Sequence, residues 1–225
     1  MRKFNTTRYK KFLKTDKFGK NIIYLEKIDS TNNFAFRILK DKTKNSRILN
    51  GTLVLAETQK KGRGRLERPW LSPPGGLWFT LILKTGLEEK KLPEVTLIAA
   101  YSAAVVLNRE YNIKVTIKWP NDLYYKKTKL GGILTEAEKI NSSIFLIIGI
   151  GINANIGIED LAPFNNESIS ISTILGKDIE RECLLPRILF EFEKNYNYYS
   201  RTEDFKTIFK KIEEILDYGM NDLIS

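Results

Sequence analysis

Apolar residues recur along the chain with two spacings, and these spacings predict a mixture of strands and helices. Short runs rich in apolar and β-branched residues predict strands at 22–28, 52–57, 77–83, 114–119, 130–136 and 144–150. Helical spacing predicts helices at 92–109, 184–199 and 205–216, and a further helix that begins at an N-cap formed by Ser30 or Thr31. Because 114–119 and 130–136 bracket a turn, we expect these two strands to pair with each other.

Strands and helices do not alternate regularly in this pattern. A polar, glycine-rich loop at 58–76 lies between two predicted strands, where a doubly wound domain would have a crossover helix. We therefore expect an α/β (α+β) fold with one mixed sheet flanked by helices. A length of 225 residues, 42% of them hydrophobic, allows one large domain or two small ones with a full core.

Composition excludes several kinds of catalytic site. The chain has no histidine, which excludes a Ser-His-Asp triad, a Cys-His dyad and a metal site with a histidine ligand. Its single cysteine, Cys183, allows no internal disulfide and fits a reducing compartment. No segment has the apolar length of a membrane span, and the basic N-terminus lacks the apolar stretch of a secretory signal. We expect a cytoplasmic protein that does not associate with membranes.

The net charge of +10 is concentrated at the N-terminus. Residues 1–20 hold eight basic side chains and one acidic one, and we treat residues 1–21 as a basic arm. Such an arm is typical of nucleic-acid binding, but also of a solvated tail in a lysine-rich protein. We favour the solvated tail.

The loop at 59–70 gathers cations around two glycines. Gly62 and Gly64 let the backbone approach a ligand closely, and consecutive N–H groups in such a loop can bind an anion. Arg63 and Arg65 can bind phosphate through paired hydrogen bonds, and Trp70 offers an indole for stacking. On composition alone, a phosphate-binding loop and a basic exposed or RNA-binding hairpin are equally well supported.

A second segment combines a turn signal with glycines in a predicted strand. Asn121 and Asp122 follow Pro120, which predicts a turn that leaves an amide and a carboxylate at a strand end. Lys129 precedes Gly132 in the next strand, where glycine usually marks the close approach of a ligand or another backbone. An ordinary hairpin with an ion pair from Asp122 to a lysine explains the same residues.

Two shorter segments are weak signals when taken alone. Glycines at 149 and 151 would let a ligand lie against a buried strand, with Asn153 as a polar anchor, but a turn at a strand end has the same composition. Ser30, Thr31 and Asn32 have the composition of a helix cap and also offer three polar groups to a small ligand.

Taken in order, these segments resemble the biotin protein ligase family, enzymes that attach biotin to a lysine of a carboxylase carrier domain. The matches are 29–32, 62–70, 118–122, 129–132 and 149–153. The resemblance implies the catalytic fold of class II aminoacyl-tRNA synthetases and biotin–lipoate ligases, here over 22–216. It also implies ATP with Mg²⁺, formation of biotinyl-AMP, and transfer of biotin to a carrier lysine. Members of the family often form homodimers, and the sequence does not decide this point.

The resemblance also implies roles for individual residues. The biotin-binding positions are Ser30, Thr31, Asn32, Gln59, Gly62, Arg63, Lys129 and Gly132. The ATP-binding positions are Arg63, Arg65, Trp70, Asn121 and Asn153. The catalytic candidates are Lys129, Arg65 and Asp122: the two cations stabilise the reacting anions, and Asp122 orients or deprotonates the acceptor amine. No set of protein side chains is expected to bind a metal ion.

The chain departs from the family pattern in three places. Glu67 stands where the loop of the family has a glycine, so it places a Cβ where a positive φ is needed. Its carboxylate is expected to weaken ATP binding or to bridge to Arg63 or Arg68. The stretch before residue 22 is shorter than the winged-helix domain of bifunctional members, so we expect a monofunctional enzyme without operator binding. Residues 217–225 resemble only the entry to a small C-terminal β-barrel, which we expect to be absent.

Three alternatives stay open on the sequence. A lipoate or octanoate ligase would use the same adenylate chemistry, although the loop at 62–65 and the string at 118–122 favour biotin. A degenerate core would bind biotin without catalysis. A basic nucleic-acid-binding module would use the N-terminal arm and Trp70, with affinity that falls as salt rises.

Overall fold

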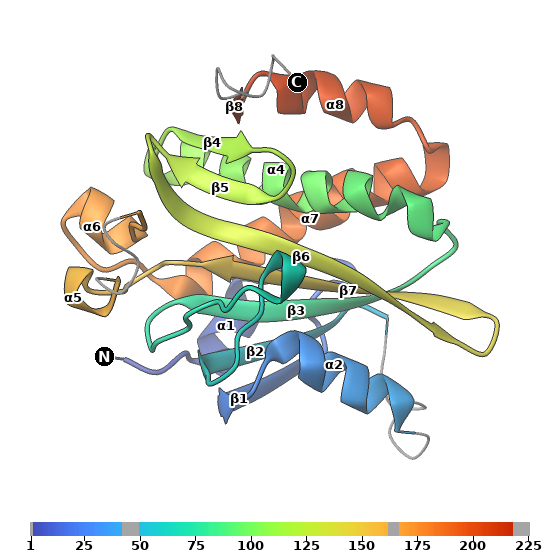
Figure 1. Ribbon diagram of the computed structural model, residues 1–225, viewed down its shortest axis with the longest axis horizontal. Coiled ribbons are helices and arrows are strands. Elements are labelled where there is room, and N and C mark those ends of the chain that lie inside the picture. The colour runs from blue at the N-terminus through green and yellow to red at the C-terminus, as the bar shows by residue number, and fades with distance from the viewer. Residues whose placement is uncertain (1, 42–49, 162–166, 218–225) are drawn as a thin grey trace.

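One mixed sheet forms the centre of the molecule in the computed structural model, which describes residues 2–41, 50–161 and 167–217. Within these residues the strand order is β1-β2-β3-β7-β6-β5-β4-β8 (Figure 1). The strands are β1 (Ile22–Ile28), β2 (Thr52–Gln59), β3 (Leu77–Thr85), β4 (Val115–Lys118), β5 (Asp122–Tyr125), β6 (Thr128–Ile140), β7 (Ser143–Ile152) and β8 (Leu216–Asp217). The outer pairs β1–β2 and β4–β8 are parallel, and the inner pairs are antiparallel. The expected mixed α/β fold is confirmed.

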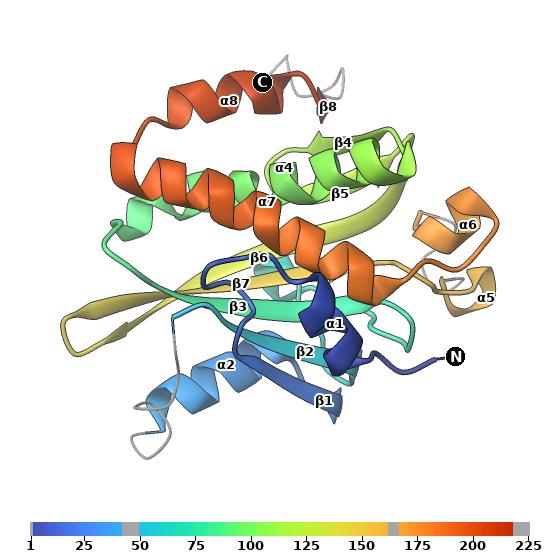
Figure 2. The same ribbon diagram turned by 180° about the vertical axis from the view of Figure 1, so that it is seen from behind.

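Helices cover both faces of this sheet (Figures 1 and 2). The α-helices are α1 (Thr6–Phe12), α2 (Thr31–Lys40), α4 (Leu92–Tyr111), α5 (Ile158–Leu161), α6 (Ile171–Leu175), α7 (Arg181–Thr202) and α8 (Phe205–Glu213), and the 3₁₀ turns are η1 (Arg65–Glu67) and η2 (Glu89–Lys91). The long helices α4 and α7 pack on one face and form the main core with it. On the opposite face, α2 covers Val54, Ile82 and Ile147. Beyond α2 this second face is left to the loop at 60–76, which makes room for a site.

The predicted pairing of 114–119 with 130–136 is wrong, because β5 lies between them. β4 pairs with β5, and β5 pairs with β6, both antiparallel. The four residues of β5 directly follow the turn at Pro120 and Asn121. The turn signal in the sequence therefore extends into residues that already belong to a strand. The strand predicted to end at 150 also continues to Ile152, which places Gly149 and Gly151 inside β7.

The N-terminal segment is packed against the domain, so the expectation of a solvated tail is wrong for residues 2–20. Phe4, Tyr9 and Phe18 are buried against the main core, and α1 contacts α7. The carboxylate of Glu193 accepts the backbone N–H groups of residues 16, 17 and 18 at 2.6–2.8 Å. The lysines of this segment are exposed, and α1 buries only one of its faces.

A buried ion pair ties the same segment to the sheet. Arg181 Nη1 donates to Glu57 Oε2 at 2.9 Å, and both side chains are at most one-tenth exposed. The backbone N–H of Phe4 and the hydroxyl of Tyr24 donate to the other oxygen of Glu57. Because this carboxylate bonds to three partners, residues 2–5 belong to the packed structure.

The C-terminal helix is shorter than predicted, since α8 ends at Glu213 and Leu216 belongs to β8. Of the predicted stub at 217–225, all but Asp217 lies outside the described residues. None of the helices within the described ranges combines the length and the apolarity that crossing a bilayer requires.

Candidate active site

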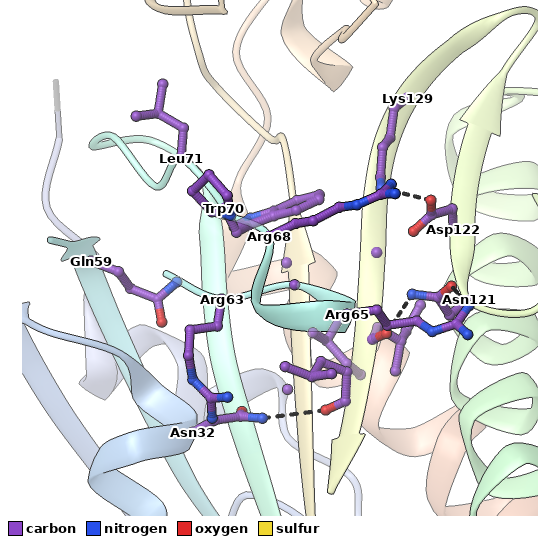
Figure 3. Close-up of a pocket in the computed structure, with 18 of the residues that line it drawn as sticks. Asn32, Gln59, Arg63, Arg65, Arg68, Trp70, Leu71, Asn121, Asp122 and Lys129 are labelled. Atoms are coloured by element: carbon purple, nitrogen blue, oxygen red, sulfur yellow. Dashed lines mark hydrogen bonds and ion pairs between the residues drawn. The ribbon is translucent and has the colours of Figure 1, made fainter. Parts of the chain in front are cut away.

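A cavity of about 580 Å³ opens between the start of α2, the loop at 60–76 and the strands β5, β6 and β7. The predicted site residues that line it are Ser30, Thr31, Asn32, Gln59, Arg63, Arg65, Trp70, Asn121, Asp122, Lys129, Gly132 and Asn153. Figure 3 shows side chains from these separate segments turned toward a common space. Gly62 does not line the cavity. A Cβ at this position would lie 2.2 Å from the carbonyl oxygen of Trp70, so Gly62 lets the loop fold on itself.

The start of α2 is fixed to the end of β2 by a glutamine. The hydroxyl of Ser30 caps the helix by accepting the N–H of Asn33. The backbone N–H and the hydroxyl of Thr31 both donate to Gln59 Oε1, at 2.8 and 3.0 Å. The amide nitrogen of Gln59 then donates to Ser72 Oγ at 2.7 Å, so α2, β2 and the loop form one polar wall.

An ion pair on the surface beside this wall supports the start of α2. Arg37 donates to both carboxylate oxygens of Asp29, at 2.6 and 2.8 Å. These hydrogen bonds lower the pKa of Asp29 to about 2, so the carboxylate stays ionised further into the acid range than a free aspartate does. Because Asp29 directly precedes the N-cap, the pair holds the first turn of α2 in place.

Asn32 lies on the floor of the cavity, and its polar atoms are held by the protein. Its Oδ1 accepts the hydroxyl of Thr80 at 2.6 Å, and its Nδ2 donates to Glu136 Oε2 at 2.7 Å. These two contacts fix which end of the amide faces each neighbour. Glu136 was not among the predicted site residues. The period-2 alternation of β6 was the available signal, because it places Glu136 on the same face as Gly132 and Leu134.

Arg63 is held between two carboxylates. Its Nη2 lies 3.0 Å from both oxygens of Glu136, its Nη1 donates to Glu67 Oε1 at 2.7 Å, and its Nε donates to Asn33 Oδ1 at 2.9 Å. Burial by itself lowers the pKa of Arg63, but the two carboxylates outweigh burial and raise it. The expected bridge from Glu67 to Arg63 is therefore present. Leu66 and Glu67 both have positive φ, 54° and 56°, as expected for a position where glycine would be unstrained.

Glycines in β6 and β7 let side chains lie flat on the sheet. A Cβ at Gly149 would be 2.3 Å from Asn32 Oδ1, and one at Gly151 would be 2.8 Å from Trp70 Nε1. A Cβ at Gly132 would be 3.5 Å from the indole of Trp70. The glycine pattern thus marks a close approach, as predicted. The groups that approach the glycines are side chains of the protein itself, among them the indole of Trp70.

Lys129 extends from β6, and its ammonium lies beside Asp122 (Figure 3). Its Nζ lies 2.6 Å from Asp122 Oδ2 and 5.1 Å from the ring centre of Trp70. The indole Nε1 of Trp70 is buried and has no hydrogen-bond partner among the described residues. A ligand oxygen that reaches this nitrogen would satisfy it.

Two further arginines point toward the cavity without a carboxylate partner in the described part of the chain. Arg65 Nη1 donates to Asn121 Oδ1 at 3.2 Å, and Asn121 in turn donates to the carbonyl oxygen of Ile133 at 2.9 Å. Arg68, which was not among the predicted site residues, also lines the cavity. Both arginines are exposed, so their charge is available to an incoming anion.

Asn153 closes the end of the site. It is 4% exposed, and its amide nitrogen donates to the carbonyl oxygens of Ile169 and Lys129 at 3.1 and 3.4 Å. Its position therefore depends on the segment at 167–170, which also contributes Glu167 and Ser168 to the lining. Within the described residues, no group of three or more carboxylate or cysteine side chains is arranged to hold a metal ion.

Comparison with known proteins places these features in a family. Residues 24–153 match the model of the biotin/lipoate A/B protein ligase family. The bifunctional ligase/repressor BirA of Bacillus subtilis is 36% identical over 190 residues, which cover 83% of this chain and 57% of that protein. The human biotin–protein ligase is 28% identical over 203 residues, which cover 85% of this chain and 27% of that protein. The chain thus spans little more than half the length of its bacterial relative.

Solved structures of similar fold include enzymes with bound ligands. The biotin protein ligase of Aquifex aeolicus in complex with biotin and ATP superposes with a TM-score of 0.71 at 33% identity, over 88% of this chain and 79% of that one. The Leishmania major enzyme in complex with biotinyl-5-AMP has a TM-score of 0.69 at 24% identity, over 89% of this chain and 83% of that one. Sequence and fold lead to the same group of proteins.

Proposed function

Since the chain belongs to the biotin/lipoate A/B protein ligase family, we propose that it activates biotin with ATP and transfers it to a lysine of a biotin carrier domain. One observation carries this proposal. The cavity joins a polar wall suited to an uncharged head group with a wall of cations suited to a carboxylate and a triphosphate. The Aquifex aeolicus relative of similar fold was solved with biotin and ATP.

The polar wall is proposed to receive the biotin head group. Ser30, Thr31 and Gln59 lie together there, and Asn32 contributes an amide whose orientation is already fixed. These hydroxyl and amide groups bond to one another and keep capacity for further hydrogen bonds, so a ligand that can use this capacity binds better than one that cannot. This property supports the ureido ring of biotin over the dithiolane of lipoate, which offers no N–H or C=O.

The first reaction step joins two anions. An oxygen of the biotin carboxylate attacks the α-phosphorus of ATP, a P–O bond to the β-phosphate breaks, and pyrophosphate leaves with the electron pair. The product is a mixed anhydride of biotin and AMP. Lys129, Arg65 and Arg68 reduce the repulsion between the anions and stabilise the charge that develops on phosphate oxygens. Histidine is not required for this step.

The second step transfers the acyl group. The neutral amine of the acceptor lysine attacks the anhydride carbonyl, an amide bond forms, and AMP leaves with the electrons of the C–O bond. The amine must lose a proton, and Asp122 is the proposed acceptor or orienting group. In the free protein this carboxylate is paired with Lys129 at 2.6 Å, so both groups are held at the same place.

Magnesium is proposed to enter as part of the nucleotide substrate. The described side chains do not form a cluster that would hold a metal ion by themselves. Mg²⁺ commonly binds through substrate phosphates with few protein ligands, which suits such a site. We expect the reaction to take place in the cytoplasm, where ATP is supplied.

Acceptor labelling tests the proposal. The protein is incubated with biotin, ATP, Mg²⁺ and an isolated biotin carrier domain, and the carrier is then analysed by mass spectrometry. We expect the mass of one biotinyl group on one lysine, and no label when that lysine is replaced by arginine. Labelling by lipoate or octanoate but not by biotin would overturn the choice of substrate. No transfer despite formation of biotinyl-AMP would overturn the second half of the proposal.

A further inference from the structure

The guanidinium of Arg63 has an excess of negative neighbours before any ligand is bound. One positive charge faces the carboxylates of Glu136 and Glu67, at 3.0 and 2.7 Å. Arg63 therefore offers an incoming anion less attraction than its position in the cavity suggests. The neighbouring Arg65 has no such partner within the described residues and stays available.

The two carboxylates on Arg63 differ in how firmly they are held. Glu136 contacts Arg63 with both oxygens, also accepts from Asn32, and its side chain is 25% exposed. Glu67 makes one contact and its side chain is 75% exposed. An exposed ion pair is screened by water and contributes little, so Glu67 can leave Arg63 at small cost. Glu136 cannot leave without also releasing Asn32.

Few contacts hold the backbone turn at Glu67 in place. Leu66 and Glu67 both have left-handed φ values, which residues other than glycine rarely adopt. The turn is held by backbone hydrogen bonds from Gly64 to Arg68 and from Arg68 to Arg65, in addition to the ion pair. Leu66 is 83% exposed and offers this turn no packing. Among these contacts, the ion pair is the one that an anionic ligand can replace directly.

We propose that Glu67 is a displaceable counter-ion for Arg63, whose place is taken by the oxyanion of the ligand. The inference rests on the proposed function for the identity of that ligand, in which the oxyanion is the carboxylate of biotin or a phosphate of ATP. In this role Glu67 weakens the binding of every anion at Arg63 and leaves the binding of uncharged ligands unchanged. Glu67 therefore reduces the advantage that an anionic ligand has over an uncharged ligand at this site.

The test compares Glu67→Gln with the wild-type protein by titration calorimetry. The probes are biotin, its uncharged amide, and ATP with Mg²⁺. The variant keeps the size of the side chain and removes its charge. Because the position is exposed, we expect the variant to fold as the wild type does. We expect Glu67→Gln to bind biotin or ATP about three- to fivefold more tightly, the size of one exposed ion pair. Biotin amide should bind both proteins equally. Which of the two anions gains affinity identifies the one that reaches Arg63.

Glu167→Gln is the matched control, because Glu167 lines the same cavity and has no ion pair to Arg63. It should change the two affinities less than Glu67→Gln does. Equal binding of biotin and of ATP by wild type and Glu67→Gln would overturn the inference and leave the proposed function intact. An equal gain for biotin amide, or an equal gain from Glu167→Gln, would also overturn it. A wild-type protein that binds neither biotin nor ATP would overturn both.

Discussion

Replacing Lys129 by alanine should impair catalysis much more than folding, because this lysine contributes far more to stabilising the reacting anions than to the stability of the fold. Its ammonium lies 2.6 Å from Asp122 and 5.1 Å from the ring centre of Trp70. Both members of the ion pair are about one-quarter exposed, at 27% and 24%. The charge is therefore partly screened, and its contribution to folding must be discounted accordingly.

The two effects of Lys129→Ala differ in size. For a partly exposed pair we expect a loss of about 1 kcal/mol in the free energy of unfolding, with ~0.5 kcal/mol more from the cation–π contact. For the reaction, the loss of one positioned charge at a developing anion costs about 3–4 kcal/mol. At ~1.4 kcal/mol for each factor of ten, pyrophosphate release should slow by a factor of about 10² to 10³.

Two measurements on the same preparation check this prediction. Pyrophosphate release is followed with biotin and ATP, and unfolding is followed in urea. Lys127→Ala serves as the control, because Lys127 is exposed, lies two residues away and does not line the cavity. Pyrophosphate release by Lys129→Ala within about threefold of the control would refute the role given to Lys129. Loss of the urea transition would refute its small role in stability.

Three further predictions concern the fold and the polar wall. Glu57→Gln should lower the free energy of unfolding in urea by about 3 kcal/mol, because it leaves a buried arginine without its counter-charge; a loss under ~1 kcal/mol would contradict this. Gly149→Ala should weaken biotin binding in calorimetry by at least about tenfold, because its Cβ would displace Asn32 from a distance of 2.3 Å; unchanged affinity would remove Asn32 from the biotin wall. Hydrogen bonds from Arg37 hold the pKa of Asp29 near 2, below its usual 3.8, so the stability from this pair is present above pH 4 and lost as the pH falls toward 2. Asp29→Asn should flatten that part of the profile of urea stability against pH, and an unchanged profile would contradict the assignment.

The periodicity of the sequence predicts the long elements, because each buries a continuous apolar face. It does not predict β5, whose four residues follow directly on a turn signal and of which only Leu123 is buried. Nor does it predict the packing of α1, since a helix rich in lysine is polar on average although one face of it buries Tyr9. Local composition reports the average character of a segment, whereas packing depends on one side of it.

The cavity was predictable as a set of ordered motifs, but not as a set of contacts. Gly149 and Gly151 signal a close approach, and the sequence does not say that Asn32 and Trp70 make it. Glu136 lies 104 residues from Asn32, and their hydrogen bond exists only because α2 packs over β6 in one register. Interactions of this kind depend on tertiary placement, so a sequence pattern cannot specify them.

Titration calorimetry with biotin, lipoate and octanoate, each with and without ATP and Mg²⁺ and paired with an assay of pyrophosphate release, tests the central claim most directly. We expect biotin to bind more tightly than the other two acids, and to cause pyrophosphate release when ATP and Mg²⁺ are present. Tight binding without pyrophosphate would contradict catalysis. Binding of lipoate or octanoate in preference to biotin, or of no acid at all, would contradict the claim that this cavity activates biotin.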